Sequence, residues 1–234
     1  MPFPLAHPAA VLPLRRFAPQ WLCFPALVIG SMAPDLGYLF ERWDMSDVAH
    51  RFIGSAVFSL PVGLLVYVLF RVLRVPLVKT LPERWRDAFL PLCQHPLGSW
   101  YAVVISIILG AWSHFLWDSF THKDGWLTMH FAFLQAPVAM VGSRHFRVCH
   151  LLWYLSTLGG VAWITFFSLR WLFSVLAGVR KFPQWVLYLD TFVITMQVFI
   201  VAAAHHLAQP PLAIAVAGLV ATLIAGGIFW RTMK

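Results

Sequence analysis

Long apolar runs separated by short polar segments dominate this chain. Five of these runs cover residues 52–72, 100–121, 149–170, 185–206 and 211–230. Each is close to the roughly 20 residues that an α-helix needs to cross the hydrocarbon core of a bilayer. The pattern therefore predicts an all-α fold, a polytopic bundle of transmembrane helices. We expect a single integral membrane domain over residues 1–234, because the sequence has no internal repeat, low-complexity tract or long linker.

Two further apolar segments are interrupted. Residues 21–38 are broken by Gly30, Pro34 and Asp35, and as a sixth span they would bring the bundle to five to six helices. Residues 127–141 contain Pro137, and we expect them to form a re-entrant or interfacial segment packed on protein, not a full span.

The composition supports a membrane protein. The 234 residues are 60% hydrophobic and only 11% charged, whereas a soluble domain carries about a quarter charged residues. The net charge of +8 could indicate nucleic-acid binding, but the Arg and Lys residues lie in short loops and no nucleic-acid motif is present. Three scattered cysteines (Cys23, Cys93 and Cys149) imply no disulfide framework. The first residues lack the basic start of a cleaved signal peptide.

The basic loops orient the predicted bundle. They follow the first, third and fifth strong runs and contain Arg71, Arg74, Lys79, Arg84, Arg86, Arg170, Arg180, Lys181, Arg231 and Lys234. The positive-inside rule places these loops, and with them the C-terminus, in the cytoplasm. Lys123, Arg144 and Arg147 depart from the pattern, because they fall on the outer side.

Three polar residues end the second strong run. His114, Asp118 and His122 are spaced i, i+4 and i+8, so a helix presents them on one face. Ionisable groups at membrane depth are costly and usually mark a functional site. Imidazole and carboxylate are also ligands of zinc and similar divalent metals. The other interpretations are a hydrogen-bonded His114–Asp118 pair and a His122 that favours the helix dipole.

Other candidates come from separate parts of the chain. Asp35 follows Pro34 and is either a ligand or a helix N-cap. His50 begins the first strong run at the outer face, level with His114, and Arg51 beside it either anchors the helix end or binds an anionic group. His7 from spacing alone is better read as an exposed terminal residue. His150 and Tyr154 lie one turn apart at the outer start of the third run.

Several ordered motifs resemble a bacterial membrane family, the domain of unknown function DUF4184. They are Met1–Leu14, Ala26–Leu36, the segment around His50, and Gly110–Gly125. The pattern is also similar to membrane-bound metal-dependent hydrolases and, more faintly, to zinc-dependent phospholipase C. This resemblance implies that the metal ligands are His7, Asp35, His50, His114 and Asp118, with His122 nearby. The family pattern has a further His where Tyr154 stands, and His150 is the candidate to replace it.

The leading hypothesis is a metal-dependent hydrolase in the bacterial inner membrane. It would hold a divalent metal, zinc above all, and act on a membrane lipid or lipid phosphate near the outer leaflet, with His122 as ligand or acid/base and Arg51 binding an anionic group. One alternative is a non-enzymatic protein with a structural metal site or a transport or accessory role. A hydrogen-bonded core without metal is another.

The distribution of basic loops makes the topology testable. Reporter fusions at Arg86 and at Lys234 should both indicate the cytoplasm, because the loops that contain them are positively charged. A periplasmic signal at either position would contradict the orientation.

Overall fold

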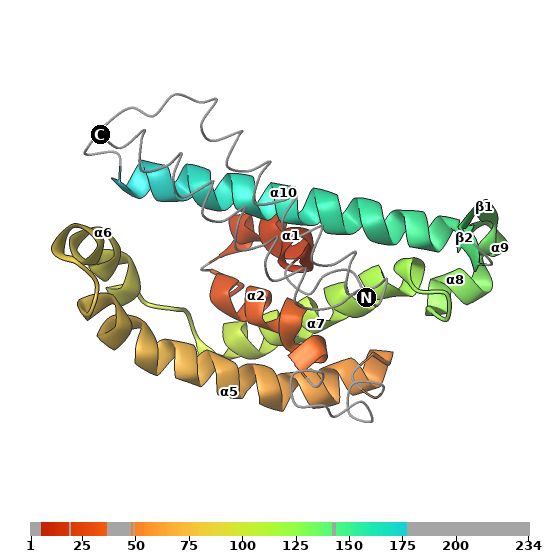
Figure 1. Cartoon of the computed structure of the whole chain (residues 1–234). Helices are drawn as coiled ribbons and strands as arrows, with labels where there is room; N and C mark the ends of the chain where they lie inside the picture. Colours follow the sequence, from red (N-terminus) through yellow and green to blue (C-terminus); the bar gives the residue numbers. More distant parts are fainter. Residues whose placement is uncertain (1–5, 19, 37–47, 49, 142–143, 177–234) are drawn as a thin grey trace, which may run out of the picture. The chain divides into compact units, whose positions relative to one another are not determined.

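The computed structural model describes residues 6–18, 20–36, 48, 50–141 and 144–176 (Figure 1). Two compact units divide the chain, residues 1–154 and 155–234. The elements are α1 (Pro8–Val11), η2 (Leu12–Phe17), α2 (Phe24–Met32), η3 (Ala33–Asp35), α5 (Phe52–Lys79), α6 (Glu83–Gln94), α7 (Trp100–Thr121), α8 (Trp126–His130), α9 (Ala132–Gln135), β1 (Pro137–Val141), β2 (Arg144–Arg147) and α10 (Val148–Leu176).

Three of the helices, α5, α7 and α10, are long and apolar enough to cross a membrane. They coincide with the runs expected at residues 52–72, 100–121 and 149–170, and the mainly helical fold is confirmed. The spans expected at residues 185–206 and 211–230 lie outside the described residues.

The interrupted segment near residue 30 forms no span of its own in the described structure. Helix α2 has nine residues and is therefore about 13 Å long, less than half of a hydrocarbon core of about 30 Å. It continues into the short 3₁₀ turn η3, which ends at Asp35. The polypeptide thus brings a carboxylate to the end of a short buried helix.

Two regions differ from the structure we expected: one contains β-strands and the other contains a helix in place of a loop. Residues 126–147 form the short helices α8 and α9 and then an antiparallel hairpin, in which β1 pairs with β2 and Met140 lies opposite His145. Pro137 begins β1, a position where a missing N–H is tolerated. Several basic residues that we expected in loops lie in helices instead. Arg71, Arg74 and Lys79 belong to α5, Arg84 and Arg86 belong to α6, and Arg170 belongs to α10. Trp85 and Phe89 stack one turn apart on α6.

The first unit depends on close packing of α2 against α7. A Cβ atom at Gly110 of α7 would lie 2.5 Å from the carbonyl oxygen of Leu27, and one at Gly30 of α2 would clash with the backbone of Ile107. Small residues of this kind let helix backbones approach closely in membrane proteins. The backbone N–H of Cys23 also donates to Ser106 Oγ at 2.8 Å, so a buried hydrogen bond joins the same two segments.

Helix α5 packs on the other flank of α7. Gly63 of α5 lies against the side chain of Ile107, which is fully buried. The core around Ile107 contains Ala26, Val103 and Tyr67 from α2, α7 and α5. These three helices therefore share one apolar core, beside which the polar residues of α7 lie.

A methyl group at Gly110 should weaken this packing. We expect Gly110→Ala to destabilise the protein by about 1–3 kcal/mol, the usual range for an overpacked core. Gly159→Ala is the matched control, because a Cβ at Gly159 meets nothing within 4 Å and alanine is the better helix former by about 1 kcal/mol. Thermal unfolding in detergent would measure both. Equal midpoints would contradict the tight contact.

Candidate metal centre

His114 and Asp118 lie one turn apart near the C-terminal end of α7, and both are buried. His114 Nδ1 lies 2.8 Å from the carbonyl oxygen of Ser31 at the end of α2. A carbonyl only accepts hydrogen bonds, so Nδ1 carries a proton, and Nε2 is the ring nitrogen that is able to bind a metal. Metal-ligating histidines commonly use their second ring nitrogen in this way.

Nε2 of His114 lies close to a second imidazole and to two carboxylate oxygens. Nε2 of His50 lies 3.3 Å from it, Oδ1 of Asp35 lies 3.5 Å from it, and Oδ2 of Asp118 lies 3.3 Å from it. His50 Nε2 is also 3.3 Å from the Asp35 oxygen and 3.4 Å from the Asp118 oxygen. Four ligand atoms from three separate segments therefore converge.

These separations fit a small divalent metal. In a tetrahedral site with zinc bonds of about 2.0–2.1 Å, neighbouring ligand atoms lie about 3.3–3.4 Å apart. The four distances between the imidazole nitrogens of His50 and His114 and the carboxylate oxygens are 3.3–3.5 Å, close to that value. The donor set of imidazole and carboxylate is one that zinc accepts.

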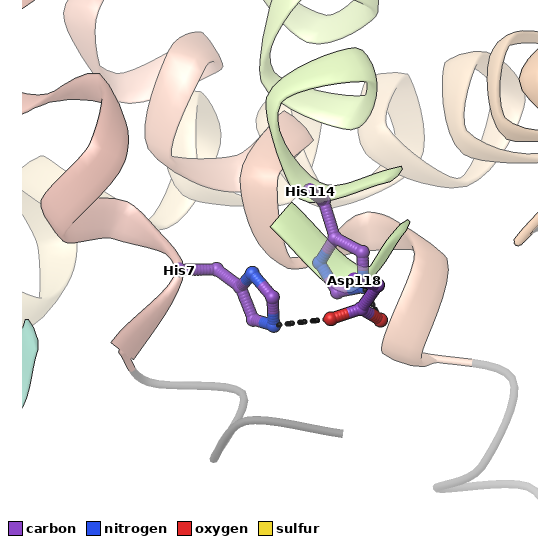
Figure 2. Close-up of side chains that lie close together, drawn as sticks. All are labelled: His7, His114 and Asp118. Atoms are coloured by element: carbon purple, nitrogen blue, oxygen red, sulfur yellow. Dashed lines mark ion pairs between the residues drawn. The ribbon is translucent and has the colours of Figure 1, made fainter. Parts of the chain in front are cut away.

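His7 faces Asp118 and forms an ion pair with it (Figure 2). Its Nε2 is 3.6 Å from Asp118 Oδ1, and its ring stacks on that of His114 with centroids 3.8 Å apart. Asp118 thus turns one oxygen toward His7 and the other toward His50 and His114. Two groups of ligand atoms result, His7–His114–Asp118 and Asp35–His50–His114, and within each group the atoms lie within 4.8 Å of one another.

The local sequence explains how these residues are held. His7 immediately precedes α1, whose Val11 is fully buried against Leu22 and Leu27. His50 lies in a turn closed by a hydrogen bond from Arg51 N–H to the Val48 carbonyl, directly before α5. Asp35 ends η3, which α2 places beside α7. Three short segments therefore bring their polar residues to one end of α7.

The cluster contains buried polar atoms that lack partners. Both oxygens of Asp35, both oxygens of Asp118 and both ring nitrogens of His7 have no hydrogen bond within the described chain, although imidazoles lie at ion-pair distance. Each buried unsatisfied polar group costs about 1–3 kcal/mol. A cation bound among them would satisfy several of these atoms at once, so the residues present fit a divalent metal.

The charges of the flanking ligands agree with this interpretation. Burial, together with the neighbouring His114, lowers the pKa of His7 to about 3, so His7 is a neutral imidazole. Burial alone would raise the pKa of Asp35, but His114 and His50 outweigh it and lower that pKa to about 2. Burial would likewise lower the pKa of His50, yet Asp118 and Asp35 raise it to about 9. The two carboxylates therefore favour a positive charge between them.

The remaining predicted site residues lie at the rim or elsewhere. His122 follows α7, its Nδ1 lies 3.1 Å from the Asp118 carbonyl oxygen, and its buried Nε2 has no partner in the described chain. Burial lowers the pKa of His122. Arg51 is exposed beside His50. His150 joins neither group of ligands among the described residues; its Nδ1 accepts a hydrogen bond from Arg147 N–H.

Sequence reasoning missed the groups that position His114. Neither the Ser31 carbonyl nor the contact between Gly30 and Gly110 was predicted. Gly110 lies four residues before His114 and Gly30 lies one before Ser31. Small residues one turn from a candidate ligand are a signal for close backbone approach.

The class defined by these features is an apolar helical protein with a buried His–Asp cluster. The family model described as "Domain of unknown function (DUF4184)" matches residues 1–232, and the chain belongs to this family. No curated protein and no solved structure matches the chain. The likeness to membrane-bound metal-dependent hydrolases and to zinc-dependent phospholipase C stays a prediction.

Metal analysis tests the centre directly. Purified wild-type protein should retain zinc, whereas His114→Ala should lower zinc affinity by more than about tenfold, because even residues that only orient a ligand are worth 10–100-fold. His145→Ala is the control, since His145 is exposed on β2 and joins neither ligand group. Zinc content by mass spectrometry and a competitive chelator titration measure the effect. Equal zinc retention by the two variants would contradict the assignment.

Proposed function

We propose that the chain is a membrane-embedded, metal-dependent hydrolase that acts on a lipid or lipid phosphate near the outer leaflet. The observation that carries the proposal is the close approach of four residues, of which Asp35, His114 and Asp118 are buried and His50 is partly exposed. The imidazole nitrogens of His50 and His114 lie 3.3–3.5 Å from carboxylate oxygens of Asp35 and Asp118 that have no hydrogen bond in the described chain. His7 completes the proposed zinc ligands. The proposal includes a bacterial inner-membrane location with five spans and a cytoplasmic C-terminus, on the basis of the apolar runs and the basic segments between them.

A bound zinc ion would lower the pKa of water toward about 7 and polarise a phosphoryl or acyl oxygen. Around it, His122 is suited to proton transfer, because its Nε2 is unpartnered while Nδ1 is held by the Asp118 carbonyl. Arg51 is exposed next to His50 and is suited to bind an anionic group of the substrate. His7, His50 and His114 present neutral imidazole when they act as ligands.

Partial exposure of the cluster favours catalysis over a closed site. The side chains of His50 and His122 are 19% and 25% exposed, whereas that of His114 is fully buried. The cluster is therefore accessible from the side of His50 and His122. Apolar side chains of the same helix ends, including Phe52 and Leu116, are also exposed. This combination supports a substrate with both a polar headgroup and apolar chains.

A structural metal site in a non-enzymatic protein is the second candidate. It is favoured by the nearly complete burial of His7, Asp35, His114 and Asp118. Structural zinc sites are closed by four protein ligands, whereas catalytic sites keep one position open. A transport or accessory role belongs to the same alternative, and turnover of substrate separates it from the hydrolase.

Loss of Asp118 should remove activity without removing the protein from the membrane. We expect Asp118→Ala to lower metal-dependent hydrolysis across a panel of phospholipids and lipid phosphates by at least about 100-fold, because it deletes a proposed ligand. Asp124→Ala is the control, since Asp124 is exposed after α7. Insertion should persist, because removing a charge makes a helix easier to insert.

Two results would favour the structural alternative. One is a wild-type protein that binds zinc but turns over no lipid in the panel. The other is an Asp118→Ala variant that fails to fold, as judged by size-exclusion chromatography in detergent, while the wild type is inactive.

A further inference from the structure

The segment from α8 to β1 exposes large apolar side chains and buries polar ones. Six large apolar side chains within it are exposed: Trp126, Met129, Phe131, Phe133, Val138 and Met140. Phe133 is 71% exposed and Met129 is 66% exposed. A water-facing surface rarely carries so many large apolar groups together, and such a patch marks contact with a membrane or a partner.

Polar residues occupy the inner face of the same segment. Thr128 is fully buried, and its hydroxyl donates to the Ser119 carbonyl in α7 at 3.1 Å. The amide nitrogen of Gln135 donates to the Thr128 carbonyl, and Arg147 Nη1 donates to Gln135 Oε1. The polar side chains are thus used to fix the segment to the end of α7, and the aromatic side chains are left outside.

The attachment to α7 is close. A Cβ atom at Gly125 would lie 2.5 Å from the carbonyl oxygen of Ser119 and 2.9 Å from that of Asp118. The chain therefore turns tightly against the helical turn that carries the metal-centre carboxylate. The exposed aromatic face is held next to the cluster, not on a remote loop.

The position along the chain identifies what covers this face. The segment follows α7 and precedes α10, and both helices are long and apolar enough to cross a membrane. It consequently lies where two spans leave the hydrocarbon on one side. Trp is enriched at that level of a bilayer, and Trp126 begins the segment. Exposed Leu116 and Trp117 near the end of α7 extend the apolar surface toward the segment.

We infer that the segment Trp126–Met140 inserts its aromatic face into the lipid leaflet beside the His–Asp cluster. This contact does not require catalysis. Its consequence for substrate rests on the proposed function: a lipid would reach the cluster sideways from the leaflet, with its headgroup toward His50 and His122 and its chains along the inserted face.

Photo-crosslinking to lipid tests the insertion of this segment directly. Benzoylphenylalanine would replace Phe133 in protein reconstituted into phosphatidylethanolamine–phosphatidylglycerol vesicles, and adducts would be identified by mass spectrometry. Leu65, exposed on α5, is the lipid-facing control, and Asp124 is the water-facing control. We expect a phospholipid adduct at Phe133 with a yield close to that at Leu65 and several-fold above that at Asp124.

The outcomes separate this inference from the proposed function. A protein adduct at Phe133 in native membranes, or no lipid adduct there while Leu65 labels lipid, would overturn the inference. The lipid adduct should persist in Asp118→Ala, because insertion does not depend on metal. Lipid adducts at Phe133 in a wild type that hydrolyses no lipid would support the insertion and contradict the hydrolase. Lipid hydrolysis by a wild type that gives no lipid adduct at Phe133 would support the hydrolase and contradict the insertion.

Discussion

The contact between α2 and α7 determines the rest of the first unit. Because Gly30 and Gly110 have no side chains, the two backbones approach closely enough for the Ser31 carbonyl to reach His114 Nδ1 at 2.8 Å. The same approach places η3, and with it Asp35, beside the last turns of α7. A bulkier residue at either glycine would separate a carboxylate from an imidazole that lies on a different helix. The same close approach of α2 and α7 therefore packs the apolar core and sets the geometry of the polar cluster.

Charge balance is the second constraint. Asp35 and Asp118 are both buried, and a buried carboxylate needs a positive partner. His7 is held neutral by its burial. Without a metal, protonated imidazole beside the two carboxylates supplies compensating charge, which is why the pKa of His50 rises to about 9. A divalent ion would displace that proton and neutralise both carboxylates. The proposed cation site is supported by the carboxylate oxygens, which have no hydrogen bond in the described chain and lie 3.3–3.6 Å from imidazole nitrogens.

Periodicity predicted what lies within one helix, and it was less informative about contacts between segments. The i, i+4 spacing was sufficient to place His114 and Asp118 on one face of α7. His50 and Asp35 could be expected nearby because each lies at the end of an apolar run. His7 could not, since its place depends on Val11 packing against Leu27 in a different element. The hairpin of β1 and β2 was missed because strands of five and four residues carry a weak periodic signal. Helix α6 was missed for another reason: its 12 residues are amphipathic, but its basic residues indicated a loop.

The two faces of the cluster differ, and the difference bears on its use. On the side of α2 and α7 the ligands are sealed by Ser31 and the glycine contact, which fixes His114 in one tautomer and one orientation. On the side of His50 and His122 the side chains are partly exposed, and His122 keeps an unpartnered nitrogen. A purely structural metal site does not need an accessible side, because such sites are closed by protein ligands. The proposed hydrolase would need one rigid wall to hold a metal and one accessible wall to admit a substrate, so this asymmetry supports the proposal.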